Sequence, residues 1–91
     1  MKNAWKSFLS LCQKTKTPDE LSRLLACFLT VEEKKSISDR YAIIAALLDA
    51  QLSQRDISEK LNVSIAKITR GSNALKIVDP ALKSFLEKHI I

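Results

Sequence analysis

The sequence predicts an all-α protein, and three observations lead to this prediction. Helix start signals recur along the 91 residues, and apolar residues between them follow the spacing of a helix face. Strand-like alternation of apolar and polar residues is absent from all but the shortest stretches. Glycine occurs once and proline twice, so little in the chain interrupts a helix. We therefore expect a single helical domain with short connections.

The start signals divide the chain into six segments. Capping residues precede five of them, namely Thr17, Thr30, Ser53, Ser64 and Asp79. Pro18 follows the first of these caps and Pro80 the last, in the first helical position that proline favours. Thr30 and Glu33 have the spacing of a capping box. The helices expected from these signals lie near residues 3–15, 18–28, 31–49, 54–61, 65–77 and 80–90.

Each of the first three segments carries an apolar face. The residues that share these faces are Trp5, Phe8, Leu9 and Cys12; Leu21, Leu24, Leu25 and Phe28; and Ile37, Tyr41, Ile44, Ala45 and Leu48. At 46% apolar residues, a chain this short has much surface to hide and little core of its own. We expect much of this surface to be buried inside the fold or against a partner.

Charge and cysteine usage limit the function classes. The net charge of +5 indicates an anionic partner. The N-terminal residues lack the apolar core of a signal peptide and no apolar run is long enough to cross a bilayer, so we expect a cytoplasmic protein without membrane contact. Cys12 and Cys27 then read as reduced thiols. With His89 as the one histidine, no metal site and no catalytic constellation is predicted, and we expect no enzyme.

The most informative segment runs from residue 53 to residue 77. A short helix, a turn over residues 62–64 and a longer helix have the sequence shape of a helix-turn-helix. Asn62 suits the turn because asparagine tolerates the left-handed backbone conformation. Five basic and two acidic side chains fall between Ser53 and Lys76. These features alone leave two interpretations equally open, DNA binding and a solvated face on a structural helix pair.

Gly71, the one glycine, lies inside the longer of these two helices. Glycine in a helix interior costs roughly 1 kcal/mol relative to alanine. The position therefore requires the absence of a side chain.

The stretch "LSQRDISEKLNVSIAKITRGSNALK" (residues 52–76) resembles the DNA-reading segment of the tryptophan operon repressor family, in which "ITRGSN" within a helix-turn-helix is specific. The similarity extends to Trp5, Phe8, "LLACFLTVEE" (residues 24–33), Arg40 and "FLEKHII" (residues 85–91). It implies an intertwined all-α homodimer formed by one domain, residues 1–91. Residues 1–50 and 80–91 would dimerise, and residues 53–77 would read DNA.

The resemblance implies L-tryptophan as co-repressor. Arg40 and Arg70 would flank the indole plane, where guanidinium groups stack on aromatic rings. Gly71 would leave space for the ligand. The residues implied to bind tryptophan are Cys27, Leu29, Thr30, Arg40, Ile43, Ile44, Arg70, Gly71 and Ala74. Ala74 departs from the family's usual serine, which leaves a relative with another effector, or with none, as an alternative.

The resemblance also implies binding to double-stranded operator DNA, with Arg55 in contact with guanine. The residues implied to face DNA are Gln54, Arg55, Ser64, Ile65, Ala66, Lys67, Thr69, Asn73 and Lys76. Ser58 departs from a usual lysine, and Lys67, which often is threonine, restores the charge. A helical interaction module with an acidic protein partner is the alternative from a different class.

Overall fold

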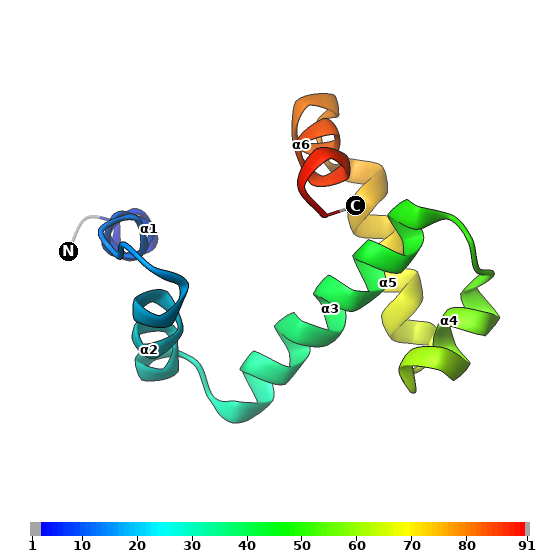
Figure 1. Ribbon diagram of the computed structural model, residues 1–91, viewed down its shortest axis with the longest axis horizontal. Helices are drawn as coiled ribbons and strands as arrows, with labels where there is room; N and C mark the ends of the chain where they lie inside the picture. Colours follow the sequence, from blue (N-terminus) through cyan, green and yellow to red (C-terminus); the bar gives the residue numbers. More distant parts are fainter. Residues whose placement is uncertain (1–2, 91) are drawn as a thin grey trace. The chain divides into compact units, whose positions relative to one another are not determined.

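The computed structural model describes residues 3–90 and contains helices and no strands within that range. The helices are α1 (Ala4–Gln13), α2 (Pro18–Phe28), α3 (Val31–Asp49), α4 (Gln54–Leu61), α5 (Ile65–Ile77) and α6 (Pro80–Ile90) (Figure 1). The predicted all-α class is confirmed, and helices α2 to α6 have the expected bounds.

Helix α1 is shorter than expected because its last turn tightens. The backbone N–H groups of Lys14 and Thr15 donate to carbonyls three residues back, those of Leu11 and Cys12, at 3.1 and 3.2 Å. The Thr15 hydroxyl also donates to the Cys12 carbonyl at 2.7 Å. These bonds satisfy the end of the helix without continuing it.

The chain forms two compact units, Met1–Lys34 and Lys35–Ile91. The division falls within α3, between its first turn and the rest of the helix. The first unit thus consists mainly of α1 and α2, and the second contains most of α3 together with the helix-turn-helix and α6.

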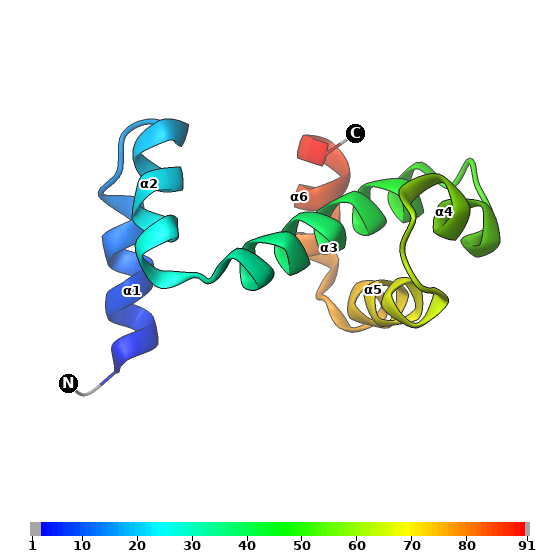
Figure 2. The ribbon, with the colours of Figure 1, turned by 90° about the horizontal axis from the view of Figure 1, so that it is seen from below.

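In the first unit α1 and α2 form a helical hairpin (Figure 2). The Phe8 ring meets the Phe28 ring edge-on with centroids 5.1 Å apart, and the Trp5 ring centroid lies 5.6 Å from that of Phe8. Such pairs stabilise beyond the area that they bury. Thr17 caps α2 by accepting from the Glu20 N–H at 3.1 Å, and Pro18 opens the helix as expected. The two predicted apolar faces therefore pack on each other.

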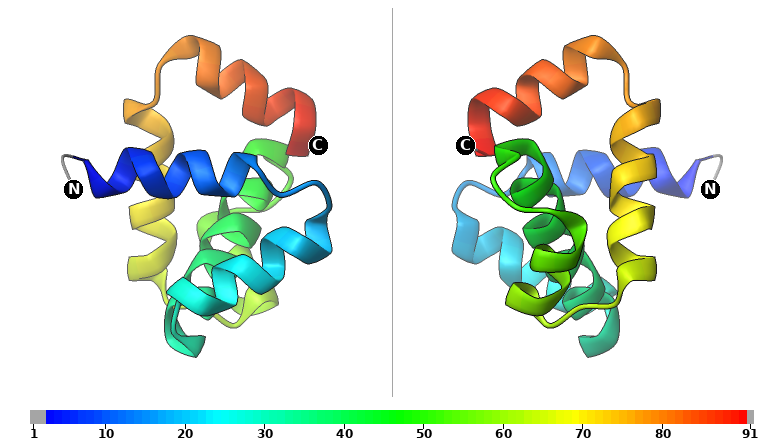
Figure 3. Two further views of the ribbon diagram at one scale, coloured as in Figure 1. Left: turned by 90° about the vertical axis from the view of Figure 1, so that its left-hand side faces the viewer. Right: turned by 90° about the vertical axis from the view of Figure 1, so that its right-hand side faces the viewer.

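In the second unit three isoleucines form the buried centre, one from each helix around the helix-turn-helix. Ile43 of α3, Ile57 of α4 and Ile68 of α5 are at most 1% exposed. Ala46, Leu47, Leu61 and Val63 pack around them. Helices α4 and α5 thus rest on the C-terminal half of α3, and α5 crosses α3 at a large angle (Figures 1 and 2; Figure 3 gives two further views). This packing fixes the orientation of α5, the helix expected to read DNA.

The turn between α4 and α5 is built as the sequence predicts. Asn62 ends α4 in the left-handed conformation, with φ 55° and ψ 49°. The Val63 N–H donates to the Ser58 carbonyl at 3.2 Å, and the Ser58 hydroxyl donates to the Val63 carbonyl at 2.6 Å. The serine thereby ties the turn back to α4.

We expect Asn62→Val to lower the free energy of unfolding by about 1–2 kcal/mol, because a β-branched residue resists the left-handed conformation. Asn62→Gly serves as the matched control and should stay close to the parent protein. Chemical unfolding followed by circular dichroism measures both. Equal losses in the two variants would mean that the Asn62 side chain matters for another reason.

Candidate effector cavity and nucleic-acid interface

A small cavity lies between α3 and α5 in the second unit. Its volume is about 90 Å³, and it is lined by Ser36, Asp39, Arg40, Ile43, Lys67 and Arg70. The structure therefore brings together three residues that the resemblance implied for tryptophan, namely Arg40, Ile43 and Arg70. Two guanidinium groups and one aliphatic wall suit a ligand with a carboxylate and a flat apolar part.

Gly71 is required by the approach of α5 to α3. A Cβ atom at this position would lie 2.8 Å from Ile43 Cγ2, which is closer than van der Waals contact allows, and 3.8 Å from Arg40 Cδ. The space beside Gly71 is thus filled by the protein itself. Helix packing directly next to the cavity is thus one reason for glycine here, and the expected one, space for a ligand, stays a prediction.

The other residues expected to bind tryptophan are not among the lining residues of this cavity. Ile44 and Ala74 are half-buried in the second unit and are not among its lining residues. Cys27, Leu29 and Thr30 belong to the first unit, where they form the end of α2 and the connection to α3. Cys12 and Cys27 both have free thiols. Roles for these five site residues in ligand binding stay predictions.

Thr30 has a structural role that the sequence predicted. Its hydroxyl accepts from the Glu33 N–H at 3.0 Å, and Glu33 Oε1 accepts from the Thr30 N–H at 2.8 Å. This capping box starts α3. The bonds from the Thr30 backbone and, second, its side chain hold the pKa of Glu33 below its usual value.

This lowered pKa predicts how acid affects the start of α3. A carboxylate whose pKa is lower in the folded state stabilises the fold above its unfolded pKa, near 4.5, and this contribution is lost as pH falls through the folded pKa. We expect the parent protein to melt at a higher temperature than Glu33→Gln at pH 7, and the difference to shrink below pH 4.5. Thermal melts of both proteins across that range test this, and a constant difference would contradict it.

Asp39 joins α3 to α5 at the cavity, a contact that sequence reasoning missed. Its Oδ1 lies 3.2 Å from Lys35 Nζ, and its Oδ2 lies 3.2 Å from Lys67 Nζ. The hydrogen bonds from Lys35 and, second, from Lys67 lower the pKa of Asp39. The i, i+4 spacing of Lys35 and Asp39 was readable in the sequence. The partner across 28 residues was not, because it depends on how α5 lies on α3.

The residues expected to face DNA all lie on the surface of the helix-turn-helix. They are Gln54, Arg55, Ser64, Ile65, Ala66, Lys67, Thr69, Asn73 and Lys76, and each is exposed. Ser53 and Ser64 cap α4 and α5 by accepting backbone N–H groups at 3.1 and 3.2 Å. Helix N-termini of this kind favour anions such as phosphate. The arrangement can present a basic, polar face to a nucleic acid.

Two details of this face differ from the expectation. The Ser58 side chain is committed to the turn through Val63, so it offers no contact to a phosphate. Lys67, expected to restore the missing charge, is paired with Asp39. The positive charge that this part of the helix-turn-helix (residues 53–77, called the head below) can offer to DNA is therefore smaller than the sequence suggests.

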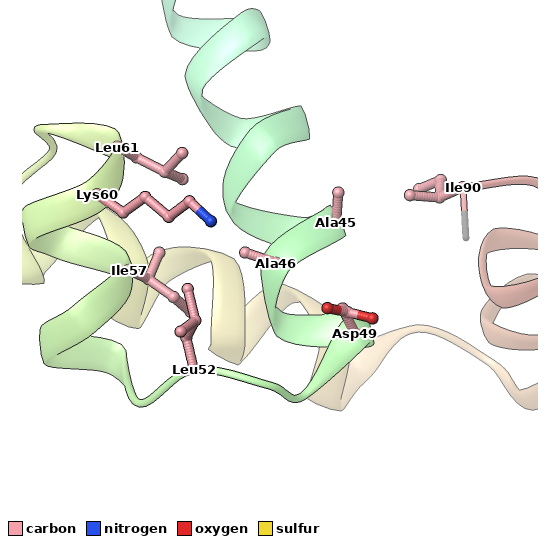
Figure 4. A pocket seen from close by; sticks show the side chains of 8 residues that line it. All are labelled: Ala45, Ala46, Asp49, Leu52, Ile57, Lys60, Leu61 and Ile90. Carbon is pink, nitrogen blue, oxygen red and sulfur yellow. The ribbon is translucent and has the colours of Figure 1, made fainter.

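A larger apolar pocket lies on another side of the second unit, and sequence reasoning did not identify it. Its volume is about 390 Å³ (Figure 4). Its lining residues come from α3, α4, the loop between them and the end of α6: Ala45, Ala46, Asp49, Leu52, Ile57, Lys60, Leu61 and Ile90. Lys60 is its one basic group, so it lacks the paired guanidinium groups of the smaller cavity.

Residues 3–90 hold neither a metal-binding cluster nor a membrane-spanning helix. No three His, Cys, Asp or Glu side chains in this range come together as a metal site would require. None of the helices described there is both long and apolar enough to cross a membrane.

The fold and this head define a class of helical proteins with a helix-turn-helix, and comparison with known proteins gives the family. The family model described as Trp repressor protein matches residues 3–90. A Trp operon repressor homolog of Chlamydia caviae is 53% identical over 85 residues, covering 93% of this chain and 84% of the relative. The homolog from Chlamydia trachomatis serovar D is 51% identical, covering 97% and 94%. One from Histophilus somni is 37% identical, covering 94% and 81%.

The chain belongs to the Trp repressor protein family. This is a family of transcription regulators and not of enzymes, which confirms the predicted resemblance and the expectation that the chain is a repressor without enzymatic activity.

Proposed function

We propose that this protein is a tryptophan-dependent transcriptional repressor that binds palindromic operator DNA as a homodimer in the cytoplasm and represses genes of tryptophan supply. The observation that carries the proposal is that Arg40 and Arg70 line one cavity between α3 and α5, and that α5 also presents an exposed face. Family membership supports it, as do the names of the relatives. Occupancy of the cavity would then act directly on the helix that reads DNA.

Exposed apolar side chains support the dimer. In the second unit Ile37, Tyr41 and Phe85 are each 57% exposed. Ile37 and Tyr41 lie one turn apart on α3, and neighbouring exposed apolar side chains of this kind are typical of a protein interface. Two heads related by a two-fold axis would enter successive major grooves about 34 Å apart. Palindromic DNA matches that symmetry, and residues 1–91 would then form one domain through the shared core.

The size of the cavity bears on how an effector acts. Ligand pockets usually enclose about 300–1,000 Å³, whereas the space between Arg40 and Arg70 is about 90 Å³. We therefore expect α5 to move away from α3 when an indole enters between the two arginines. That movement would change the position of the reading helix, which links the ligand to DNA binding. Such couplings are typically 1–3 kcal/mol.

Fluorescence anisotropy of a red-labelled palindromic operator tests the proposal. The protein is titrated onto the DNA with and without L-tryptophan. We expect tryptophan to tighten binding at least about tenfold, within the usual range of such couplings. Equal binding in both conditions would contradict the role of tryptophan, and absence of binding to a panel of operators would contradict the role of DNA.

One observation favours a second candidate, a regulator with a different effector. Ala74 has no hydroxyl to hold an amino group, and the loss of one such hydrogen bond weakens binding by about 0.5–1.5 kcal/mol. Calorimetry with tryptophan and with indole compounds that lack the amino group separates the candidates. Tighter binding of the latter would favour the second.

A further inference from the structure

Asp39 accepts a hydrogen bond from Lys67, a lysine on α5, the helix proposed to face DNA. Lys67 Nζ lies 3.2 Å from Asp39 Oδ2, and this bond joins α5 to α3 between two residues that line the Arg40–Arg70 cavity. The Asp39 side chain is 17% exposed and that of Lys67 is 48% exposed. The carboxylate is thus held in the groove between the helices, while the lysine reaches to it from the surface.

This pair affects how Lys67 meets an anion. Lys67 lies in the first turn of α5, where Ser64 caps the helix and the backbone N–H groups favour phosphate. While Asp39 holds the ammonium group, a DNA phosphate must compete with the carboxylate for it. The negative charge of Asp39 also repels that phosphate at close range. The pair therefore weakens one contact that the head would otherwise make.

The cavity provides a way to break the pair. Asp39 and Lys67 line it from opposite helices, as Arg40 and Arg70 do. A ligand that exceeds about 90 Å³ and enters between the two helices would separate α5 from α3 and lengthen the distance from Lys67 to Asp39. Lys35, one turn before Asp39, stays bonded to its Oδ1 at 3.2 Å because both lie on α3. The carboxylate therefore keeps a partner when Lys67 leaves, which lowers the cost of release.

We propose that Asp39 is a positioning residue that withholds Lys67 from DNA in the ligand-free protein and releases it when an effector widens the Arg40–Arg70 cavity. This inference rests on the proposed function and adds a specific link between ligand and DNA. Lys67 then has two arrangements. In one it is bonded to Asp39 on α3, and in the other it is free to contact a phosphate. Ligand and DNA both favour the free arrangement.

Asp39→Asn tests the proposal, because it removes the charge and keeps the shape. We expect ligand-free operator binding to tighten roughly fivefold per head, the upper range for a partly exposed ion pair, while binding with saturating tryptophan changes less than twofold. The gain from tryptophan therefore shrinks. The ligand-free salt dependence should steepen by about one unit of slope per head, as expected for one more phosphate contact. Anisotropy at several salt concentrations measures both.

Asp19→Asn is the matched control, since it changes the net charge equally. Asp19 pairs with Arg23 at 3.3 Å on α2, outside the helix-turn-helix. This variant should bind operator as the parent does. Equal tightening in both variants, or equal tightening of Asp39→Asn with and without tryptophan, would show a general charge effect and overturn the proposal.

Lys67→Gln provides a second, independent test from the other side of the pair. It should weaken operator binding more with saturating tryptophan than without it, so the gain from tryptophan shrinks. In this background Asp39→Asn should add a smaller ligand-free gain than it does in the parent protein. Equal weakening by Lys67→Gln with and without tryptophan would overturn the proposal, because Lys67 would then contribute to DNA binding equally in both states. If the parent protein shows no tryptophan-dependent binding, the proposed function fails together with this inference. If tryptophan tightens operator binding of the parent protein and Asp39→Asn leaves that gain unchanged, this inference fails and the proposed function stands.

Discussion

Arg70→Ala is expected to abolish the effect of tryptophan on operator binding. Arg70 is on α5, next to Gly71, and faces the same cavity as Arg40. A guanidinium group donates charge-assisted hydrogen bonds to a carboxylate and stacks on an aromatic ring, two contacts that alanine cannot make. Loss of both should weaken tryptophan binding roughly a hundredfold.

Calorimetry with tryptophan and anisotropy with operator DNA measure the two consequences. Lys83→Ala, on the exposed surface of α6, removes the same charge outside the helix-turn-helix and serves as the control. Lys83→Ala should bind operator close to the parent and keep the gain from tryptophan, whereas Arg70→Ala should lose that gain. Lys60→Gln, in the larger pocket, should bind tryptophan as the parent does. A full gain in Arg70→Ala would contradict the placement of the effector between the two arginines.

The helix bounds could be predicted from the sequence because they depend on local chemistry. Thr17, Ser53 and Ser64 each accept a backbone N–H three residues ahead, and Asn62 takes the conformation that its side chain tolerates. These interactions span a few residues, so capping residues and apolar spacing are enough to place them.

The candidate site was predictable only where the resemblance supplied it. Family motifs indicated Arg40 and Arg70, and the structure places both on one cavity. The pairing of Asp39 with Lys67 and the contact of Gly71 with Ile43 depend on the distance between α3 and α5, which no local pattern encodes. The role of Ser58 also depends on the fold. From the sequence it is only a position without the usual lysine, whereas in the structure its hydroxyl donates to the Val63 carbonyl in the turn.

Gly71→Ala is expected to lower stability, against the ordinary preference of helices. Alanine gains about 1 kcal/mol over glycine in a helix interior. Here its Cβ would lie 2.8 Å from Ile43 Cγ2, and Ile43 is 1% exposed and fixed among Ile57 and Ile68. Overpacking of this kind costs about 1–3 kcal/mol. Because Ile43 is branched and buried, we expect the cost of this contact to exceed the gain in helix preference. The free energy of unfolding should then fall by about 1 kcal/mol.

Ile43→Leu gives this prediction a sharp internal test, because leucine conserves volume but carries no γ-methyl branch at the contact. Gly71→Ala should cost less in the Ile43→Leu background than in the parent, a positive coupling that a double-mutant cycle measures. Asn73→Ala, exposed on the same helix, reports the helix preference without the contact and should not destabilise. Unfolding is followed at one protein concentration, since a dimer gains stability with concentration. If Gly71→Ala instead stabilises the protein, Ile43 yields to the added methyl group, and the closeness of α5 to α3 cannot be what requires glycine at this position.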